Sequence, residues 1–418
     1  MRASIITIGD ELIGGETVDT NSVYLARRLG ELGIGVVRIV SIADDADEIS
    51  SELMRAVDEA DLVFVTGGLG STADDVTKCA VARATGREPF VDERLLSDLK
   101  ERFKDHKGVQ PYVLENLATL PGGSRPLENP VGAAAGLAVS FRDSTVYLFP
   151  GVPREMEAIF EGTVVGELRE RRSDEFRKTR LVRTIGISES RIAERLEHML
   201  PLPGISLGSL PRTAGVDLRL TATAGNEAEA DSALEAAIEM MTGPLGRQVY
   251  STEGEDLHVV VGRMLIEKRK TIAVAESCTG GLVAHLLTDV AGISASLERG
   301  IVSYSNEAKV ESLNVDEALI RDHGAVSPEV ADAMARCVRR LAGTDIGVST
   351  TGIAGPAGGT EDKPVGLVYT ALACDEGCTV SKNVFRGART VVKQRAAAHV
   401  LDMIRCHLLD AEREQWTR

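Results

Sequence analysis

Apolar residues recur along the chain in two alternating patterns: short runs of Val, Ile and Leu, and segments with an apolar residue at every third or fourth position. In the first region the short runs stand at residues 4–8, 36–42, 62–66 and 146–149. Almost continuous apolar runs are typical of strands that are buried on both faces of a sheet. The intervening segments, such as residues 21–32 and 47–60, have the spacing of amphipathic helices. This alternation predicts a parallel sheet built from βαβ units over residues 1–170.

The pattern changes between residues 177 and 250. The elements expected there, in order, are a strand at 181–187, a helix at 189–200, strands at 205–210 and 216–224, and a helix at 226–241. This βαββα order predicts a small α+β domain of the split βαβ type. The charged stretch before it, residues 167–178, is interpreted as a solvated helix end and a linker.

Strands and helices alternate again over residues 252–418. Strands are predicted at 271–275, 301–304, 346–350, 366–373 and 379–385. A helix at 328–341 is indicated by Ser327, which can cap it, and by Pro328 at its first position. The last helix is expected at 391–409. The predicted fold class is therefore α/β, with two three-layer domains of mainly parallel sheets joined by the small α+β domain.

Composition and charge narrow the function classes. The 418 residues include 47 Lys and Arg against 63 Asp and Glu, a net charge of −16, which repels a polyanion such as DNA. We therefore expect no nucleic-acid partner. The first residues lead directly into a strand-like segment, and no apolar run approaches about 18 residues. We expect a cytoplasmic protein with no membrane partner.

The six cysteines are widely spaced, and only Cys374 and Cys378 are close in sequence. One close pair does not complete a zinc site. Cys278 follows a predicted strand, where a thiolate at a helix start would be reactive, but a small buried packing residue is the preferred interpretation.

Three glycine-containing turns in the first region each follow a strand and precede a helix. They are Gly9-Asp10-Glu11, the segment that contains Gly67, Gly68, Gly70, Asp74 and Asp75, and residues 150–153. Because the carboxyl ends of parallel strands lie at one edge of a sheet, we expect the turns to meet there and bind a ligand. Their N–H groups can bind a phosphate, and the two adjacent aspartates can hold a divalent cation. Alternatively, each glycine is required only by the backbone conformation of its turn, and each acidic residue caps a helix.

The third region carries comparable turns with small hydroxyl residues. They lie at residues 275–281, 292–296, 303–309 and 351–359, and Arg389 opens the last helix. Backbone N–H groups and an arginine suit a nucleotide phosphate. A Ser-Lys pair is an open catalytic alternative, because a partly desolvated lysine can take the proton of a serine hydroxyl. Spacing alone favours the other interpretation, in which Lys309 is a surface helix residue and the serines are caps.

These segments together resemble the CinA family over essentially the whole chain. The N-terminal motifs are residues 9–12, 19–21, 66–70 with Asp74-Asp75, and 150–156. The C-terminal motifs are residues 275–281, 304–309, 352–356 and 364–366. The resemblance implies three domains. They are a molybdopterin-binding-like (MoaB/MogA-like) domain at 1–170, a small middle domain at 177–250 and a nicotinamide-nucleotide amidase domain at 252–418.

For the C-terminal domain, the resemblance implies hydrolysis of nicotinamide mononucleotide to nicotinate mononucleotide and ammonia, a step in pyridine nucleotide recycling that needs no cofactor. Ser294 matches the serine proposed as nucleophile, Lys309 its base, and Tyr304 a neighbour that orients them. Positions that match the substrate-binding residues are Ser277, Thr279, Gly352, Ala354, Gly355 and Arg389. Lys393 stands where an arginine is common in the family; it keeps the charge but loses bidentate geometry.

For the N-terminal domain, the resemblance implies a metal-dependent ADP-ribose pyrophosphatase. Its nucleotide-binding positions are Gly9, Asp10, Glu11, Gly67, Gly68 and Gly70, and Asp74 and Asp75 would hold Mg, Mn or Co. The chain differs from the usual pattern at Ser71, Asn116, Leu117, Ala133 and Ala135. A non-catalytic binder of molybdopterin or a nucleotide is the remaining alternative. The resemblance also implies a homodimer.

Overall fold

The computed structural model describes residues 1–72, 75–104, 110–171, 176–199, 202 and 204–416. By its contacts the chain forms two compact units. The first unit comprises Met1–Thr179 and Ala222–Ala233, and the second comprises Arg180–Thr221 and Leu234–Arg418. The predicted α/β fold class is confirmed, whereas the three-domain boundaries stay a prediction.

The first unit is built on a six-stranded sheet with the order β2-β1-β3-β8-β7-β6. The strands are β1 (Arg2–Ile8), β2 (Gly35–Ile42), β3 (Leu62–Thr66), β6 (Arg125–Leu127), β7 (Gly136–Phe141) and β8 (Ser144–Phe149). The four strands predicted from their apolar runs pair in parallel. The pattern missed β6 and β7, which add an antiparallel edge through a tight β7–β8 hairpin.

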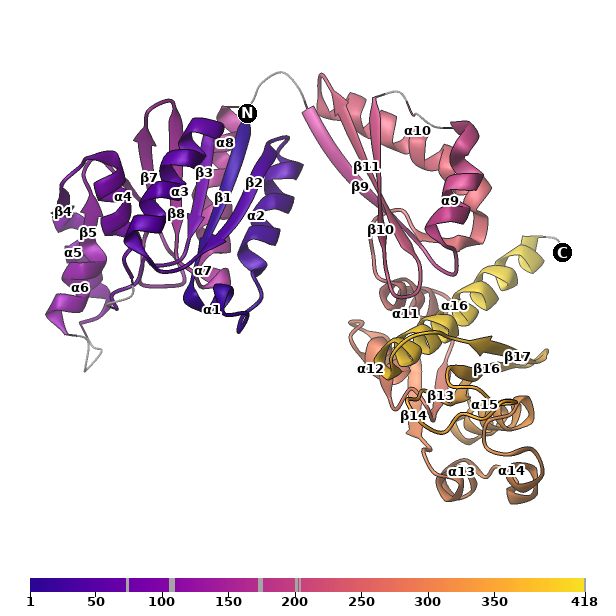
Figure 1. Cartoon of the computed structure of the whole chain (residues 1–418). Coiled ribbons are helices and arrows are strands. Elements are labelled where there is room, and N and C mark those ends of the chain that lie inside the picture. Colours follow the sequence, from indigo (N-terminus) through magenta and orange to yellow (C-terminus); the bar gives the residue numbers. More distant parts are fainter. Residues whose placement is uncertain (73–74, 105–109, 172–175, 200–201, 203, 417–418) are drawn as a thin grey trace. The chain divides into compact units, whose positions relative to one another are not determined.

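Helices cover both faces of this sheet (Figure 1). They are α1 (Asp10–Ile13), α2 (Thr20–Glu31), α3 (Ala46–Glu59), α4 (Thr77–Thr85), α5 (Glu93–Arg102), α6 (Pro111–Ala118), α7 (Pro153–Ile159) and α8 (Val165–Glu170). The short strands β4 (Pro89–Val91) and β5 (Thr119–Pro121) form a separate pair. Ile49 and Leu53 of α3 join the core on one face, and Leu25 and Leu29 of α2 join the core on the other. The three-layer arrangement follows from these two cores.

The middle of the chain forms a four-stranded sheet with the order β10-β11-β9-β12. Its elements are β9 (Phe176–Thr184), α9 (Glu189–Leu196), β10 (Ile205–Pro211), β11 (Val216–Ala224), α10 (Glu227–Leu245) and β12 (Val249–Ser251). The linker interpretation of residues 167–178 is wrong at its end, because β9 already begins at Phe176. A charged side chain of this stretch is also paired rather than solvated, because the Lys178 ammonium contacts the Glu227 and Asp231 carboxylates at 3.0 and 2.7 Å.

The C-terminal part contains a five-stranded sheet with the order β14-β13-β15-β16-β17. The strands are β13 (Ile272–Glu276), β14 (Leu297–Val302), β15 (Ile346–Gly352), β16 (Leu367–Cys374) and β17 (Gly377–Val384). The helices are α11 (Leu257–Glu267), α12 (Leu282–Thr288), α13 (Asn306–Leu313), α14 (Glu317–His323), α15 (Pro328–Ala342) and α16 (Arg389–Trp416). Strand β13 pairs in parallel with β14 and β15, whereas β16 and β17 are antiparallel. The expected cap is confirmed, because the Ser327 hydroxyl accepts a hydrogen bond from the Val330 N–H.

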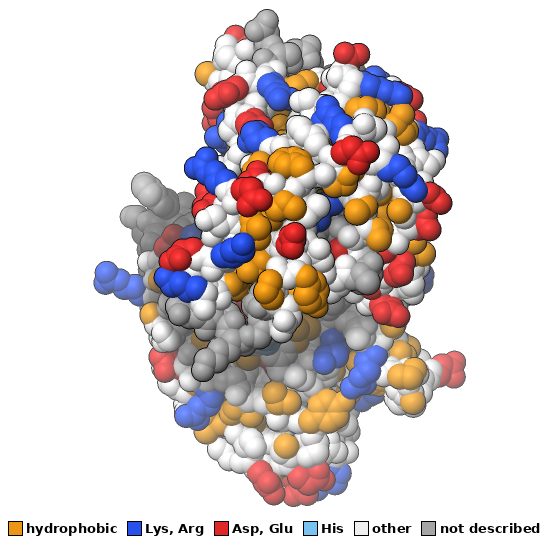
Figure 2. Space-filling model, turned by 90° about the vertical axis from the view of Figure 1, so that its left-hand side faces the viewer, with side chains coloured by type: hydrophobic (Ala, Val, Ile, Leu, Met, Phe, Trp, Pro, Cys, Tyr) orange, Lys and Arg blue, Asp and Glu red, His pale blue; other side chains and the backbone are white. Residues whose placement is uncertain are grey.

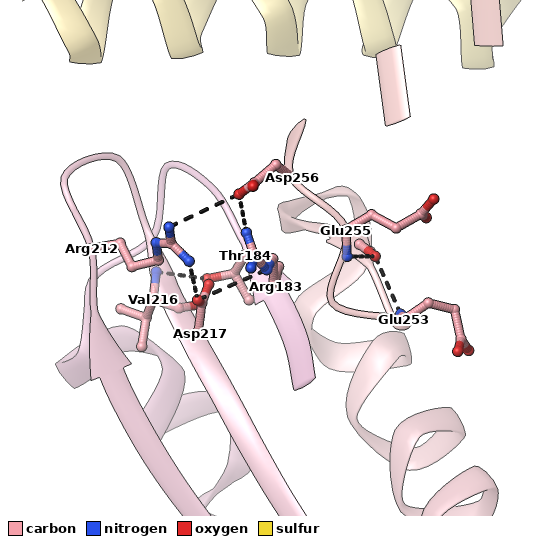
Figure 3. A network of polar contacts seen from close by, with 9 residues as sticks. Arg183, Thr184, Arg212, Val216, Asp217, Glu253, Glu255 and Asp256 are labelled. Atoms are coloured by element: carbon pink, nitrogen blue, oxygen red, sulfur yellow. Dashed lines mark hydrogen bonds and ion pairs between the residues drawn. The ribbon is translucent and has the colours of Figure 1, made fainter. Parts of the chain in front are cut away.

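Within the second unit, ion pairs connect the middle sheet to α11 (Figure 3). Arg183 of β9 pairs with Asp256, the residue before α11. Arg212, in the turn between β10 and β11, lies 2.7 Å from Asp217 and 3.9 Å from Asp256. Asp217 is almost fully buried but lies in β11 of the middle sheet itself, whereas the Asp256 carboxylate that links the sheet to α11 is half exposed.

On the face seen in Figure 2, Lys and Arg side chains are interspersed with Asp and Glu. Opposite charges that alternate in this way screen one another, so this face presents no single-sign field over long distances. In the described part of the chain, no helix is both long and apolar enough to span a bilayer.

Candidate functional site

Ser277 and Lys309 meet at the carboxyl edge of the C-terminal sheet. Ser277 directly follows the interior strand β13, and Lys309 lies on α13, which follows β14. The Lys309 Nζ atom is 3.1 Å from the Ser277 Oγ atom and 2.8 Å from the Ser303 carbonyl oxygen. The Lys309 side chain is only 1% exposed. Its burial lowers the pKa of the ammonium group below the ordinary lysine value.

This pair has the chemistry of a serine nucleophile with a lysine base. A lowered pKa increases the fraction of neutral amine, which can take the proton of the neighbouring hydroxyl. The backbone holds Ser277 in place, since its N–H donates to the Thr350 carbonyl at 2.9 Å. The hydroxyls of Thr279 and Thr350 lie 2.7 Å apart below the turn. Thr279 is fully buried, so it supports the turn from inside.

Glu276 occupies the start of α12. Its carboxylate is 1% exposed and accepts hydrogen bonds from the N–H groups of Gly281, Val283 and Ala284. A carboxylate at a helix start satisfies N–H groups that have no partner within the helix. The expectation that backbone N–H groups of this turn would bind a phosphate is therefore wrong for these three.

Tyr304 and Arg389 form a second cluster at the same edge. The Arg389 guanidinium donates to the Tyr304 hydroxyl at 2.6 Å and to the Gly355 carbonyl at 2.9 Å. The Tyr304 hydroxyl thus contacts Arg389, and the Tyr304 backbone carbonyl accepts a hydrogen bond from Lys309 Nζ at 3.4 Å. The role of Tyr304 in orienting the serine and lysine side chains stays a prediction. Ala354 is buried beside Gly355, and Gly352 ends β15, so the loop after β15 lies next to Arg389.

The prediction of Ser294 as the nucleophile served by Lys309 is wrong in this structure. Ser294 lies in a single 3₁₀ turn, Ile293–Ala295, just before the amino end of β14. Lys309 lies beyond the carboxyl end of the same six-residue strand. At about 3.3 Å per residue, the strand places the two side chains roughly 20 Å apart. The sequence signal for Ser277 was its position after the most buried strand of the domain.

Cys278 matches the interpretation as a packing residue. Its side chain is 5% exposed, and burial raises the pKa of its thiol to about 11. A thiol with so high a pKa carries little thiolate near neutral pH, so it is a poor nucleophile.

In the first unit, the three glycine-containing turns meet as predicted. They line a cavity of about 630 Å³ at the carboxyl edge of the sheet. The lining includes Gly9, Glu11, Gly67, Gly68, Gly70, Ser71, Asp75, Leu117, Ala133, Pro150 and Gly151. The carboxylate of Asp10 instead accepts a hydrogen bond from the Asp44 N–H at 3.2 Å. Gly68 has a φ of +64°, and a Cβ atom there would lie 2.2 Å from the Thr77 hydroxyl, so this turn requires glycine.

Asp75 shapes the glycine-rich turn. Its carboxylate accepts hydrogen bonds from the N–H groups of Gly70 and Thr72, both at 2.7 Å. Asp74 lies outside the described residues. Among the residues that the structure describes, no group of three or more His, Cys, Asp or Glu side chains is placed to hold a metal ion. The divalent cation at Asp74 and Asp75 therefore stays a prediction.

Sequence analysis missed Lys78 and the apolar wall of the cavity. Phe103, Val113, Leu114 and Leu117 line one side of the larger cavity. Lys78 lines an adjacent cavity of about 200 Å³ together with Asn116, and its ammonium contacts the Asn116 carbonyl at 2.5 Å. Burial lowers the pKa of Lys78 to about 8. Nothing in the sequence around Lys78 signals this environment, because its partner Asn116 lies in α6, 38 residues later.

Ala135, another position where the chain differs from the usual pattern, lines a third cavity of about 560 Å³ beside α5.

Known proteins are similar to this chain over its whole length. Over 98% of its length, the chain is 40% identical to a CinA-like protein of Geobacter sulfurreducens, and the match covers all of that protein. The chain belongs to the CinA family. It is also 42% identical to a CinA-like protein of Chlorobium limicola, over all of this chain and 97% of that protein. A solved CinA of unknown function from Thermoplasma acidophilum is 36% identical and covers 40% of this chain and 97% of its own, with a TM-score of 0.38.

Family models match three successive parts of the chain. Residues 4–170 match a probable molybdopterin binding domain, residues 179–251 a damage-inducible protein CinA KH domain, and residues 254–408 the CinA C-terminal domain. The cavity of about 630 Å³ lies in the first match. Ser277 and Lys309 lie in the third match.

Proposed function

We propose that the C-terminal part of the second unit is a nicotinamide-nucleotide amidase. It hydrolyses the carboxamide of nicotinamide mononucleotide to nicotinate mononucleotide and ammonia. The observation that carries this proposal is the contact of 3.1 Å between the buried Lys309 amine and the Ser277 hydroxyl. Such a pair fits acyl transfer, and the resemblance to the family supplies the substrate.

The proposed reaction uses the Ser277 hydroxyl as nucleophile and the Lys309 amine as proton carrier. Neutral Lys309 takes the proton of Ser277 as the Ser277 oxygen bonds to the carboxamide carbon. The tetrahedral adduct then breaks its C–N bond, and Lys309 returns the proton to the departing ammonia. Water attacks the acyl-enzyme with Lys309 again as base, which releases the carboxylate product and restores Ser277. The Ser303 carbonyl, 2.8 Å from Nζ, orients the amine throughout.

The test is ammonia release from nicotinamide mononucleotide by the full chain. We expect stoichiometric ammonia and nicotinate mononucleotide without added metal. Nicotinate mononucleotide is the control, because it has no amide to hydrolyse. Absence of ammonia from a folded protein, at every pH between 6 and 9, would overturn the proposed function.

A second function is favoured by the cavity of the first unit. In its glycine-rich turn the N–H groups of Gly70 and Thr72 are held by Asp75, so the groups that a diphosphate would use are those of the other lining residues, Gly68, Leu69 and Ser71. The wall formed by Phe103, Val113, Leu114 and Leu117 offers an apolar surface to a ring. We propose that this cavity binds ADP-ribose and, with a divalent metal, cleaves its diphosphate to AMP and ribose 5-phosphate. Binding of a nucleotide or a pterin without cleavage is the alternative.

Thermal unfolding and AMP release separate these cases. ADP-ribose near 100 times its Kd is expected to stabilise the first unit by about 2.7 kcal/mol through mass action. AMP that appears only with Mg²⁺, Mn²⁺ or Co²⁺ identifies the pyrophosphatase, whereas stabilisation without AMP identifies a binding site. If ADP-ribose changes neither the melting temperature nor the AMP level, the cavity does not bind this ligand.

A further inference from the structure

The turn between β10 and β11 of the middle sheet lies against α16 within the second unit. Arg395 of α16 donates a hydrogen bond from Nε to the Thr213 carbonyl of this turn at 2.8 Å. Two cavities, of about 480 and 360 Å³, border the turn, and residues 212–215 line both of them. Atoms that line a cavity lose packing contacts on that side. The hydrogen bond from Arg395 is therefore important for holding the turn against α16.

The same guanidinium also holds the segment that leads into α16. Arg395 donates from Nη1 to the Arg386 carbonyl at 2.8 Å, so one side chain connects this segment to the turn of the middle sheet. Residues 386–388 are exposed. The chain turns sharply at Gly387, which has a φ of +127°, and a Cβ atom there would lie 2.9 Å from the Val391 side chain. An exposed segment with few buried contacts depends on its hydrogen bonds for a fixed position.

Arg389 directly follows this segment, at the start of α16. It is exposed, and its guanidinium donates to the Tyr304 hydroxyl and the Gly355 carbonyl, as described above. Both acceptors belong to other loops of the C-terminal part, whereas the backbone of residues 386–389 determines where the Arg389 side chain begins. Because hydrogen bonds weaken steeply with distance, a shift of about 1 Å in that backbone would break at least one of the two contacts.

The pair of Ser277 and Lys309 is held by other contacts. The Ser277 N–H donates to the Thr350 carbonyl of β15, and Lys309 donates to the Ser303 carbonyl after β14. Neither contact involves α16 or the segment before it. Loss of Arg395 should therefore disturb the predicted substrate-binding residue Arg389 and leave proton transfer between Ser277 and Lys309 intact.

We propose that Arg395 is a positioning residue through which the middle sheet fixes Arg389 in the amidase site. The inference rests on the proposed amidase function and gives a role in it to the middle sheet, which contains none of the residues predicted for that site. The Arg395 guanidinium contacts two backbone carbonyls, so it acts on the site through Arg389. Arginine suits this task because its planar fork can donate to both carbonyls at once.

The experiment measures kcat and KM for nicotinamide mononucleotide in the full chain. Arg395→Met is expected to raise KM about 3- to 10-fold, as for the loss of a typical hydrogen bond, while kcat stays within about twofold. Arg395→Lys, which keeps the charge but not the fork, should give an intermediate KM. The matched control is Arg247→Met. Arg247 precedes β12 of the middle sheet and pairs with Asp410 near the other end of α16, so its loss should leave both constants within about twofold of wild type.

A double variant tests whether Arg395 acts through Arg389. Arg389→Met alone should raise KM, and adding Arg395→Met should change that KM by no more than about twofold, because the contact that Arg395 supports is already lost. Independent losses that multiply in the double variant would overturn the positioning role. An unchanged KM in Arg395→Met, or a lower kcat at unchanged KM, would overturn it as well.

Hydrogen exchange at the backbone amides of residues 386–392 gives a measurement that does not need turnover. Exchange there should be at least about tenfold faster in Arg395→Met than in wild type or in Arg247→Met, because the segment loses its contact with the middle sheet. If wild type releases no ammonia but exchange depends on Arg395 in this way, the amidase proposal fails and the link from the middle sheet to Arg389 stands. If exchange is the same in all three proteins, the link is overturned.

Discussion

Replacing Ser277 with alanine is expected to lower the kcat of ammonia release by at least about 10³-fold, the loss typical of a catalytic nucleophile. The physical reason is the geometry at the carboxyl edge of the sheet, where the Ser277 hydroxyl is the one that the buried amine of Lys309 contacts. Without that oxygen there is no acyl-enzyme. Rapid-mixing measurements at saturating substrate, with and without hydroxylamine to trap the acyl group, would follow the step directly.

Ser294→Ala is the matched control. Ser294 is an exposed hydroxyl in the turn before β14, at the opposite end of that strand from Lys309. We expect its kcat to stay within about threefold of wild type, as for a surface substitution away from the site. The reverse outcome, in which Ser294→Ala is inactive and Ser277→Ala is active, would show that the Ser277–Lys309 contact is structural. Circular dichroism of both variants checks that each is folded.

The fold could largely be predicted because its strands are marked by local composition. Residues 62–66 are four apolar residues followed by Thr66, and β3 has these same bounds and is fully buried. Strands β6 and β7 have no such mark, since they are short, lie at the edge and depend on pairing with β8. The charged start of β9 was interpreted as linker because its partners, Glu227 and Asp231, are about fifty residues away in sequence.

The candidate site was predictable as a set of turns but not as a set of contacts. Strand order explains why the turns of the first unit meet at one cavity. By contrast, Ser277 and Ser294 both lie in small-residue turns with similar sequence signals. Strand β14 separates Ser294, at its amino end, from Lys309, beyond its carboxyl end, so only Ser277 contacts Lys309. The hydrogen bonds of Asp75 and Glu276 to backbone N–H groups were equally hidden, because a carboxylate in a turn has the same sequence signal whether it binds a ligand or the turn itself.

Lys309→Met is expected to lower kcat by a factor on the order of 10³ while KM stays within about threefold, since the amine acts in proton transfer rather than in substrate binding. In the wild type, kcat should rise with pH along its acid limb. The pKa of Lys309 is lowered by burial, so the limb should lie below the ordinary lysine value of 10.5. A larger KM with an unchanged kcat would instead make Lys309 a binding residue.

The same lowered pKa has a consequence for stability, with a definite sign. Between the folded pKa of Lys309 and 10.5, the unfolded chain binds more protons at this residue than the folded chain does. Its contribution to the free energy of unfolding therefore increases as the pH rises through that interval and is least favourable below it. Lys309→Met has no such group, so the difference in melting temperature between wild type and variant should shift in favour of wild type with rising pH. A difference that is independent of pH would show that the amine has an ordinary pKa, and with it the role of Lys309 as base would be lost.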